Sequence, residues 1–193
     1  MEEVEILVQV EGSAEGALKK LSTLCTFLKC SETKDCYFFE PQKGRFQLGE
    51  HGLDECLRIR IPHNDKAKLT YKKDIFDAKG HWTHSEEEET TIEDPLIMQN
   101  ILEKLGYKEL VEINTKKHKF ETSEFHVVLE EVKELGLFLE VEAIKLLGTI
   151  EQTREKIKQF LTRTGLTLLP ESGMGKPELL LRKKNGTNHA YAT

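Results

Sequence analysis

Glutamate pairs with two-residue spacing recur on segments whose alternation of polar and apolar residues predicts β-strands. The set comprises Glu3 and Glu5, Glu87 and Glu89, Glu140 and Glu142, and a basic counterpart, Arg58 and Arg60. Residues two apart in a strand point to the same face of the sheet. One such pair is typical of a solvated strand face. Three acidic pairs and one basic pair, spread along the chain, favour a sheet that curls so that its charged face points inward.

The composition is that of an acidic protein with enough length to bury a core. The chain has 193 residues, of which 32% are charged, and a formal net charge of −6. This charge argues against a general nucleic-acid partner, which requires a basic surface. No apolar run reaches the length of a membrane span, and the acidic N-terminus does not resemble a signal peptide. The four cysteines lack metal-binding spacing, so we expect free thiols in a reducing cytoplasm, with no membrane partner.

Local patterns predict an alternation of several strands with three helices. The predicted helices begin at Ser13 with an apolar stripe extending to Leu28, at Asp94-Pro95 and at Thr149. The segment 77–85 reads as a loop. The predicted strands cover residues 3–10, 34–39, 56–61, 67–73, 86–92, 109–120, 124–132 and 137–144. Because most strands follow one another without a crossover helix, we expect an α+β protein with a largely antiparallel, closed or nearly closed barrel and helices packed outside.

Short motifs occur in a fixed order along nearly the whole chain. They are the segments 3–5 (EVE), 35–38 (DCYF), 57–60 (LRIR), 69–72 (LTYK), 87–89 (EEE), 94–95 (DP) and 130–142, the last containing Glu-Glu-Val, Leu-Gly and Phe-Leu-Glu-Val-Glu. In their order and spacing these motifs resemble the CYTH superfamily of triphosphate tunnel metalloenzymes. The resemblance is strongest to the class IV adenylyl cyclase-like and thiamine triphosphatase-like branch. It predicts one CYTH-type domain over residues 1–184, followed by a disordered polar tail over 185–193.

The resemblance implies an eight-stranded antiparallel tunnel that binds a nucleoside or other triphosphate together with Mg²⁺ or Mn²⁺. The implied reaction is either cyclisation of ATP to cyclic AMP and pyrophosphate or hydrolysis of an organic or inorganic triphosphate. It also allows a homodimer. The resemblance implies that the metal ligands are Glu3, Glu5, Glu130, Glu140 and Glu142. The substrate-binding residues are Arg58, Arg60, Lys72, Lys117, Glu87 and Glu89, and the catalytic residues are Glu5, Arg58, Arg60 and Lys72.

Three cations of the family pattern are missing from this chain. Leu7, Ser85 and Thr115 occupy their positions, and Gly175-Lys176 replaces a serine–tyrosine pair near the C-terminus. Charge-assisted contacts contribute about 1–3 kcal/mol each, so the loss of several would weaken binding or catalysis by powers of ten. The lysines that could compensate are Lys66, Lys68, Lys73, Lys116 and Lys176. Two hypotheses therefore stay open: a metal-dependent enzyme acting on a triphosphate, and a weak or inactive module that binds a nucleotide or polyphosphate.

Overall fold

The strands form a single antiparallel sheet in a computed structural model that describes residues 2–46, 53–76, 82–171 and 174–186. The order across the sheet is β1-β6-β5-β4-β3-β7-β8-β9-β2-β10. The strands are β1 (Glu2–Glu3), β2 (Glu5–Glu11), β3 (Thr26–Phe39), β4 (Glu55–Pro62), β5 (Ala67–Phe76), β6 (Trp82–Ile92), β7 (Lys108–Glu121), β8 (Phe125–Val132), β9 (Gly136–Ala143) and β10 (Thr167–Leu168). The helices are α1 (Ala14–Leu21), α2 (Pro95–Lys104), α3 (Ile150–Arg163) and α4 (Lys176–Lys184).

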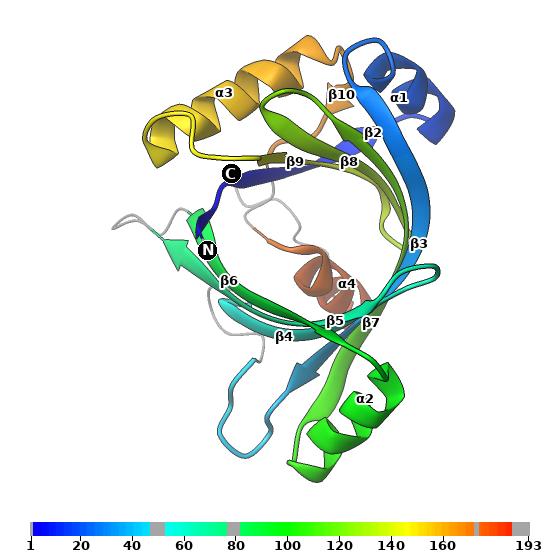
Figure 1. Ribbon diagram of the computed structural model, residues 1–193, viewed down its shortest axis with the longest axis vertical. Coiled ribbons are helices and arrows are strands. Elements are labelled where there is room, and N and C mark those ends of the chain that lie inside the picture. The colour runs from blue at the N-terminus through cyan, green and yellow to red at the C-terminus, as the bar shows by residue number, and fades with distance from the viewer. Residues whose placement is uncertain (1, 47–52, 77–81, 172–173, 187–193) are drawn as a thin grey trace.

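β1, at one end of this strand order, and β2, next to the other end, are joined by the chain itself, which gives the sheet the form of a barrel (Figure 1). β1 pairs with β6, β2 pairs with β9, and only Val4 separates β1 from β2. The ring is therefore completed by a continuous backbone and not by an unbroken hydrogen-bonded ladder. With β1 and β2 taken as one strand and the two-residue β10 set aside, eight strands form the wall. This confirms the predicted α+β class and the antiparallel tunnel with helices outside.

A large apolar cluster fixes which face of β2 and β9 points outward. Val4, Ile6 and Val8 are nearly fully buried, and they pack with Leu139 and Val141 of β9. α1 and α3 cover this outer face, α3 through Ile157 and Phe160 (Figure 1). Because alternate residues of a strand face opposite sides, the glutamates between these apolar residues face the interior of the barrel.

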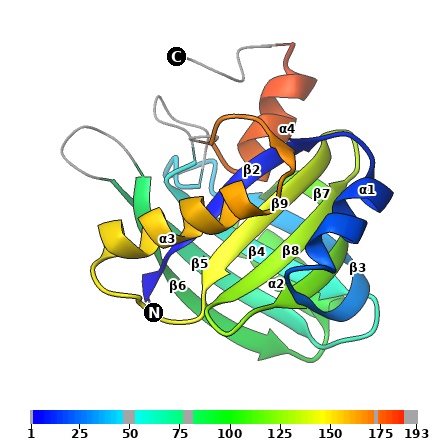
Figure 2. The ribbon, with the colours of Figure 1, turned by 90° about the horizontal axis from the view of Figure 1, so that it is seen from above.

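Helix α4 lies at one end of the barrel and was not predicted from the sequence. Leu180 is 1% exposed and packs with Tyr37 and Phe138, and Leu7 contacts the same cluster. Figure 2 shows α4 beyond one end of the strands. The sequence signal was weak because charged residues dominate both ends of the nine-residue helix, and an isolated helix of this length is marginal without tertiary contacts.

The predicted bounds near the N-terminus were wrong. Helix α1 ends at Leu21, and Thr26 already begins β3, a strand of 14 residues. Leu28 therefore lies in a strand, where it is 47% exposed. Its helical spacing from Leu21 was coincidental. The predicted loop over 77–85 is also shorter, because β6 begins at Trp82, and its residues 77–81 lie outside the described residues.

Most of the predicted apolar stripe of α2 is exposed. Leu102 is buried against β4, whereas Ile97, Ile101 and Leu105 are 57%, 44% and 66% exposed. The helix itself begins as expected, because the Asp94 side chain accepts hydrogen bonds from the backbone N–H groups of Leu96 and Ile97. None of the described helices has the length and apolarity to cross a membrane. The division into a domain over 1–184 and a tail over 185–193 stays a prediction, since residues 187–193 lie outside the described residues.

The outer cluster predicts a large loss of stability when it is truncated. Leu139→Ala removes a fully buried side chain beneath α1 and α3, and should lower the free energy of unfolding by about 2–5 kcal/mol. Leu96→Ala, at a position that is 67% exposed, serves as the control and should change it by less than about 0.5 kcal/mol. Urea titrations followed by circular dichroism measure both. Equal effects of the two substitutions would contradict the outward orientation of these β9 residues.

Candidate functional site

Four carboxylates converge inside the barrel and form what we term the acidic cluster: Glu3, Glu5, Glu87 and Glu142. Burial, followed by the nearby charges of Glu87, Glu142 and Glu5, raises the pKa of Glu3 to about 8 against the opposing effect of Lys72. Burial likewise raises the pKa of Glu142 to about 7, together with Glu5 and Glu140. Like charges held this close disfavour ionisation unless a cation is present. The inward orientation predicted for these glutamates is confirmed by their mutual influence.

Lys72 contacts two members of the acidic cluster, Glu5 and Glu3. Its side chain reaches from β5 to form an ion pair with Glu5, and its Nζ lies 3.9 Å from an oxygen of Glu3. Burial lowers the pKa of Lys72, but the adjacent carboxylate of Glu5 outweighs this effect and raises it above the ordinary value. Lys72 thus stays charged at any physiological pH. The structure places it inside, as predicted, whereas its neighbour Lys73 is exposed.

Arg58 and Arg60 lie side by side on β4 and share Asp35 of β3. Arg60 donates two hydrogen bonds to the two oxygens of Asp35, at 2.9 and 2.8 Å, the bidentate arrangement that arginine favours. Arg58 lies 4.0 Å from both Asp35 and Glu87 and donates to the Thr70 hydroxyl at 3.3 Å. Its Nε is buried and has no hydrogen-bond partner among the described residues. The β4 cations therefore retain donor capacity toward the interior.

Asp35 begins the segment 35–38 (DCYF), and the sequence did not indicate it as a site residue. Burial raises its pKa, yet Arg60 and Arg58 reverse this and hold the pKa well below the usual range. The ionised carboxylate orients both guanidinium groups. Only the cross-strand register, which pairs Asp35 with Arg60, reveals this role, because the two residues are 25 positions apart in the chain.

A second interior group, which we term the lysine–glutamate triad, joins three elements: Lys117 of β7, Glu130 of β8 and Lys176 of α4. Lys117 Nζ lies 2.7 Å from one oxygen of Glu130, at an angle outside hydrogen-bond geometry, and Lys176 donates to the other oxygen. Lys176 also donates to Glu140 at 3.0 Å. Glu130 is 0% exposed. The sequence indicated Lys176 only as one of several compensating lysines, because it did not predict α4.

The positions of the three missing cations are occupied by uncharged side chains that face the interior. Leu7 packs in the apolar cluster with Tyr37 and Phe138. Ser85 is fully buried and its hydroxyl donates to Asp74 at 2.7 Å. Thr115 is 5% exposed. The wall of the barrel therefore lacks three positive charges at these sites, as the sequence indicated.

Of the compensating lysines, the structure brings Lys176 into the interior. Lys68 forms an ion pair with Glu89, which also accepts a hydrogen bond from Thr70. Lys116 pairs with Glu131 on the outer face. The remaining two candidates, Lys66 and Lys73, are exposed.

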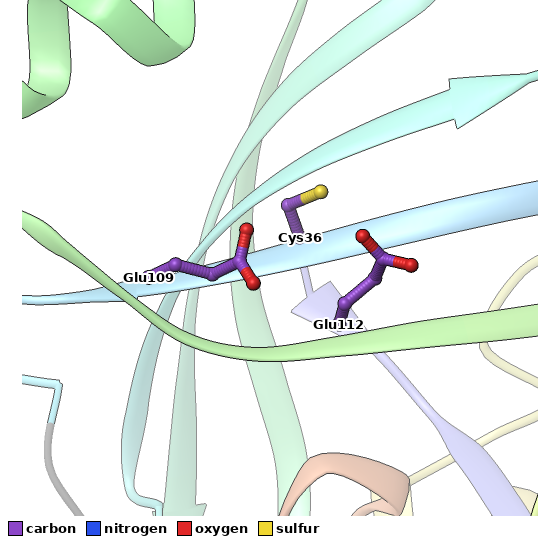
Figure 3. A group of neighbouring side chains, drawn as sticks. All are labelled: Cys36, Glu109 and Glu112. Atoms are coloured by element: carbon purple, nitrogen blue, oxygen red, sulfur yellow. The ribbon is translucent and has the colours of Figure 1, made fainter.

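One other cluster of candidate ligands and one groove do not contain the predicted site residues. The Cys36 thiol and the Glu109 and Glu112 carboxylates lie within 4.8 Å of one another (Figure 3). Burial raises the pKa of Cys36 to about 11, so its thiol is protonated at neutral pH and is a poor metal ligand. A groove of about 790 Å³ is lined by residues that include Thr115, Lys116 and Glu131. No predicted site residue lines this groove.

The acidic cluster fits a hard divalent cation by the chemistry of its donors. Mg²⁺ and Mn²⁺ prefer carboxylate oxygens with water and phosphate oxygens completing the shell. The raised pKa values of Glu3 and Glu142 are those of carboxylates that lack such a charge. Lys72 and Arg58, which contact this cluster, carry two positive charges against four carboxylates.

The architecture and this interior agree with the comparison to known proteins. The CYTH domain family matches residues 1–172, most of the described chain. The chain belongs to the CYTH domain family.

Relatives and solved structures extend this likeness over most of the chain. A candidate adenylate cyclase of Methanocaldococcus jannaschii is 33% identical over 163 residues, which covers 83% of this chain and 86% of the relative. A protein of Pyrococcus horikoshii has a similar structure, with a TM-score of 0.77, 26% identity, and coverage of 93% and 99%. A candidate adenylyl cyclase from Hippeastrum, described as having a dominant triphosphatase activity, shares the fold at 21% identity, a TM-score of 0.68, and coverage of 95% and 96%.

The raised pKa values predict that the metal-free protein loses stability as the pH rises. Folded Glu3 and Glu142 retain protons up to about pH 8 and 7, whereas their unfolded counterparts release them near 4.5. The folded state thus binds more protons in this window, and the free energy of unfolding falls by at most about 1.4 kcal/mol per pH unit for each group. Urea titrations in EDTA between pH 5 and 8 measure the slope.

Glu142→Gln should flatten this fall between pH 5 and 7, because it removes one of the two proton-retaining groups. Glu88→Gln, at an exposed position on the same barrel, is the matched control and should follow the wild type. Parallel curves for Glu142→Gln and the wild type would contradict the convergence of the acidic cluster.

Proposed function

We propose that this protein is a metal-dependent enzyme that acts on a triphosphate inside the barrel. The observation that carries the proposal is the pairing of opposite charges across one interior: the acidic cluster beside Arg58, Arg60, Lys72 and Lys117. A polyphosphate bound with a divalent cation is the ligand class that requires both kinds of charge at once. The family and the Hippeastrum structure's described triphosphatase activity support the same class.

In this proposal the carboxylates and the cations have separate tasks. Glu3, Glu5, Glu140 and Glu142 hold Mg²⁺ or Mn²⁺, and Glu87 and Glu89 orient the cations beside the substrate. Arg58, Arg60, Lys72 and Lys117 bind the phosphate oxygens. A bound divalent cation supplies further neutralisation of charge on those oxygens. Phosphoryl transfer depends mainly on such positioning and charge stabilisation, which the cations of the interior provide from positions held by their carboxylate partners.

The buried donors of β4 favour an anionic substrate over a neutral one. Arg58 is buried with an unsatisfied Nε, and an unpaired buried donor costs about 1–3 kcal/mol. A phosphate oxygen would satisfy it. Asp35 holds Arg60 in a fixed orientation, so little side-chain entropy is lost when the substrate binds.

Hydrolysis and cyclisation differ in the nucleophile, which is a water in the first and the ribose hydroxyl of ATP in the second. The candidate cyclase of M. jannaschii favours ATP as a substrate to test. The alternative function is a passive module that binds a nucleotide or polyphosphate. Its support is the loss of cations at Leu7, Ser85 and Thr115.

Product analysis tests the proposal. The purified protein is incubated with Mg²⁺ or Mn²⁺ and with ATP, thiamine triphosphate or tripolyphosphate, and the products are separated by chromatography. We expect orthophosphate release or cyclic AMP with pyrophosphate, and loss of either product in EDTA. Binding without any product would favour the passive module, and in that case Leu7→Lys with Ser85→Arg tests whether restored cations confer turnover.

Two single substitutions test which carboxylates face the interior of the barrel. Glu142→Gln should raise the metal concentration needed for half-maximal activity by at least about tenfold, because it removes a charged ligand. Glu88→Gln faces outward and should leave that concentration unchanged. A metal titration of the activity of both variants measures the difference, and similar shifts would contradict the assignment.

A further inference from the structure

We propose that Arg154 of α3 is a positioning residue that joins the two sides of the barrel's seam and thereby holds Glu5 in the acidic cluster. We use the term seam for the place where the wall passes from β1 to β2, beside Thr83 of β6. The inference rests on the proposed function, since it assigns a residue to the support of the metal site. The observation behind it is that Arg154 Nη1 donates to the backbone carbonyl of Glu5 at 3.4 Å and to that of Thr83 at 3.5 Å.

The hydrogen-bonded ladder between β1 and β6 ends before Glu5. β1 pairs with β6 as far as Glu3, which lies opposite Ser85. Continued by two residues, this antiparallel register would place Glu5 opposite Thr83. The ladder ends first, and Glu5 pairs instead with Glu142 of β9. The two carbonyl groups that are bridged from α3 therefore belong to the residues that a continued ladder would have joined.

The Glu5 carbonyl points toward β6, where this ladder is interrupted. The preceding carbonyl, that of Val4, accepts a hydrogen bond from the backbone N–H of Ala143, on the side of β9. Successive carbonyls of a strand point to opposite neighbours, so the Glu5 carbonyl is directed to the other side. A buried carbonyl with no strand bonded to it requires another donor, and Arg154 provides one.

Glu171 orients the guanidinium group in the seam. Arg154 Nη2 forms an ion pair with Glu171, and the Arg154 side chain is only 15% exposed. Glu171 follows β10, in which Leu168 pairs with Val10 of β2, so β2 itself helps to place this carboxylate. The planar fork of arginine lets its two Nη atoms bind different partners at once. Together these contacts connect β2, β6 and the segment after β10.

The carboxylates of the acidic cluster repel one another across the seam. Glu3 lies on β1 and Glu87 on β6, and each is close enough for its charge to act on the other. Like charges repel strongly where water is excluded, and the wall has no ladder beyond Glu3 to resist their separation. Arg154 binds the backbone on both sides of the seam. It therefore keeps Glu5 near the other carboxylates, at positions from which they can share one divalent cation.

Helix α3 does not depend on Arg154 to stay on the barrel. Ile157, Phe160 and Leu161 of the same helix are buried in the large apolar cluster over β2 and β9. An apolar stripe of this kind is what docks a surface helix. Removal of the guanidinium group should therefore change the seam and leave the fold intact.

Calorimetric titration of the substrate-free protein with Mn²⁺ tests the inference. Arg154→Met removes the donors but keeps an unbranched side chain, and should weaken Mn²⁺ binding by about tenfold or more, as the loss of groups that orient metal ligands commonly does. Arg154→Lys, which keeps one charged donor group, should recover part of that affinity. Arg163→Met, at an exposed position of the same helix, is the matched control and should stay within about twofold of the wild type.

Hydrogen exchange gives a second readout that requires no metal. In Arg154→Met the backbone amides of residues 2–5 and 83–86 should exchange at least about tenfold faster, because local opening of the seam becomes easier. The amides of β7 and β8, which lie elsewhere in the sheet, should keep their wild-type rates.

The two readouts separate this inference from the proposed function. Failure of the wild type to bind Mn²⁺ would overturn the proposed function, and the role of Arg154 toward the metal with it. Wild-type binding with an equal affinity in Arg154→Met would overturn the role of Arg154 alone. Faster exchange across the whole sheet would make Arg154 a residue that stabilises the fold, which also overturns its positioning role. If circular dichroism shows Arg154→Met to be unfolded, Glu171→Gln replaces it, and the same two changes are expected at about threefold or more because the guanidinium group loses its orienting charge.

Discussion

The structure depends on the neutralisation of charges that the barrel removes from water. Charged groups desolvated at low dielectric are tolerated only when they are paired or hydrogen-bonded. Asp35 and Arg60, Glu5 and Lys72, and the triad of Lys117, Glu130 and Lys176 meet this requirement. The acidic cluster meets it incompletely, and the raised pKa values of Glu3 and Glu142 are the consequence. The interior therefore has one part in which the charges are paired and another in which carboxylates outnumber the adjoining cations.

This division is possible because the outer face carries the hydrophobic stabilisation. The apolar residues of β2, β8 and β9 pack beneath α1 and α3, so alternate positions of the same strands are released for charged residues. The usual arrangement of a small soluble barrel, with an apolar inside and a polar outside, is reversed along these strands. Helix α4 adds apolar contacts at one end through Leu180, and at its start delivers a lysine to the charged interior.

The positive charge missing from the strands is partly offset by a charge from another element. Leu7, Ser85 and Thr115 leave the strands with fewer positive charges. Leu7 packs in an apolar cluster, and Ser85 donates a hydrogen bond to the Asp74 carboxylate. The charge returns from a helix that lies outside the strand order. A comparison of strand positions alone would miss this charge, although Lys176 lies within hydrogen-bond distance of Glu140.

The sequence by itself determined the antiparallel barrel and the inward direction of its glutamates. The reason is that two-residue alternation assigns a face to every strand residue, and Val4 and Ile6 left no other face for Glu3 and Glu5. It did not determine the end of α1, the exposure of Ile97 and Leu105 on α2, or the existence of α4, because apolar spacing does not say what a helix will contact. Only the tertiary structure decided which charges meet. Glu130 and Lys176 are 46 positions apart, and no local pattern encodes a contact that forms when α4 meets the end of the barrel.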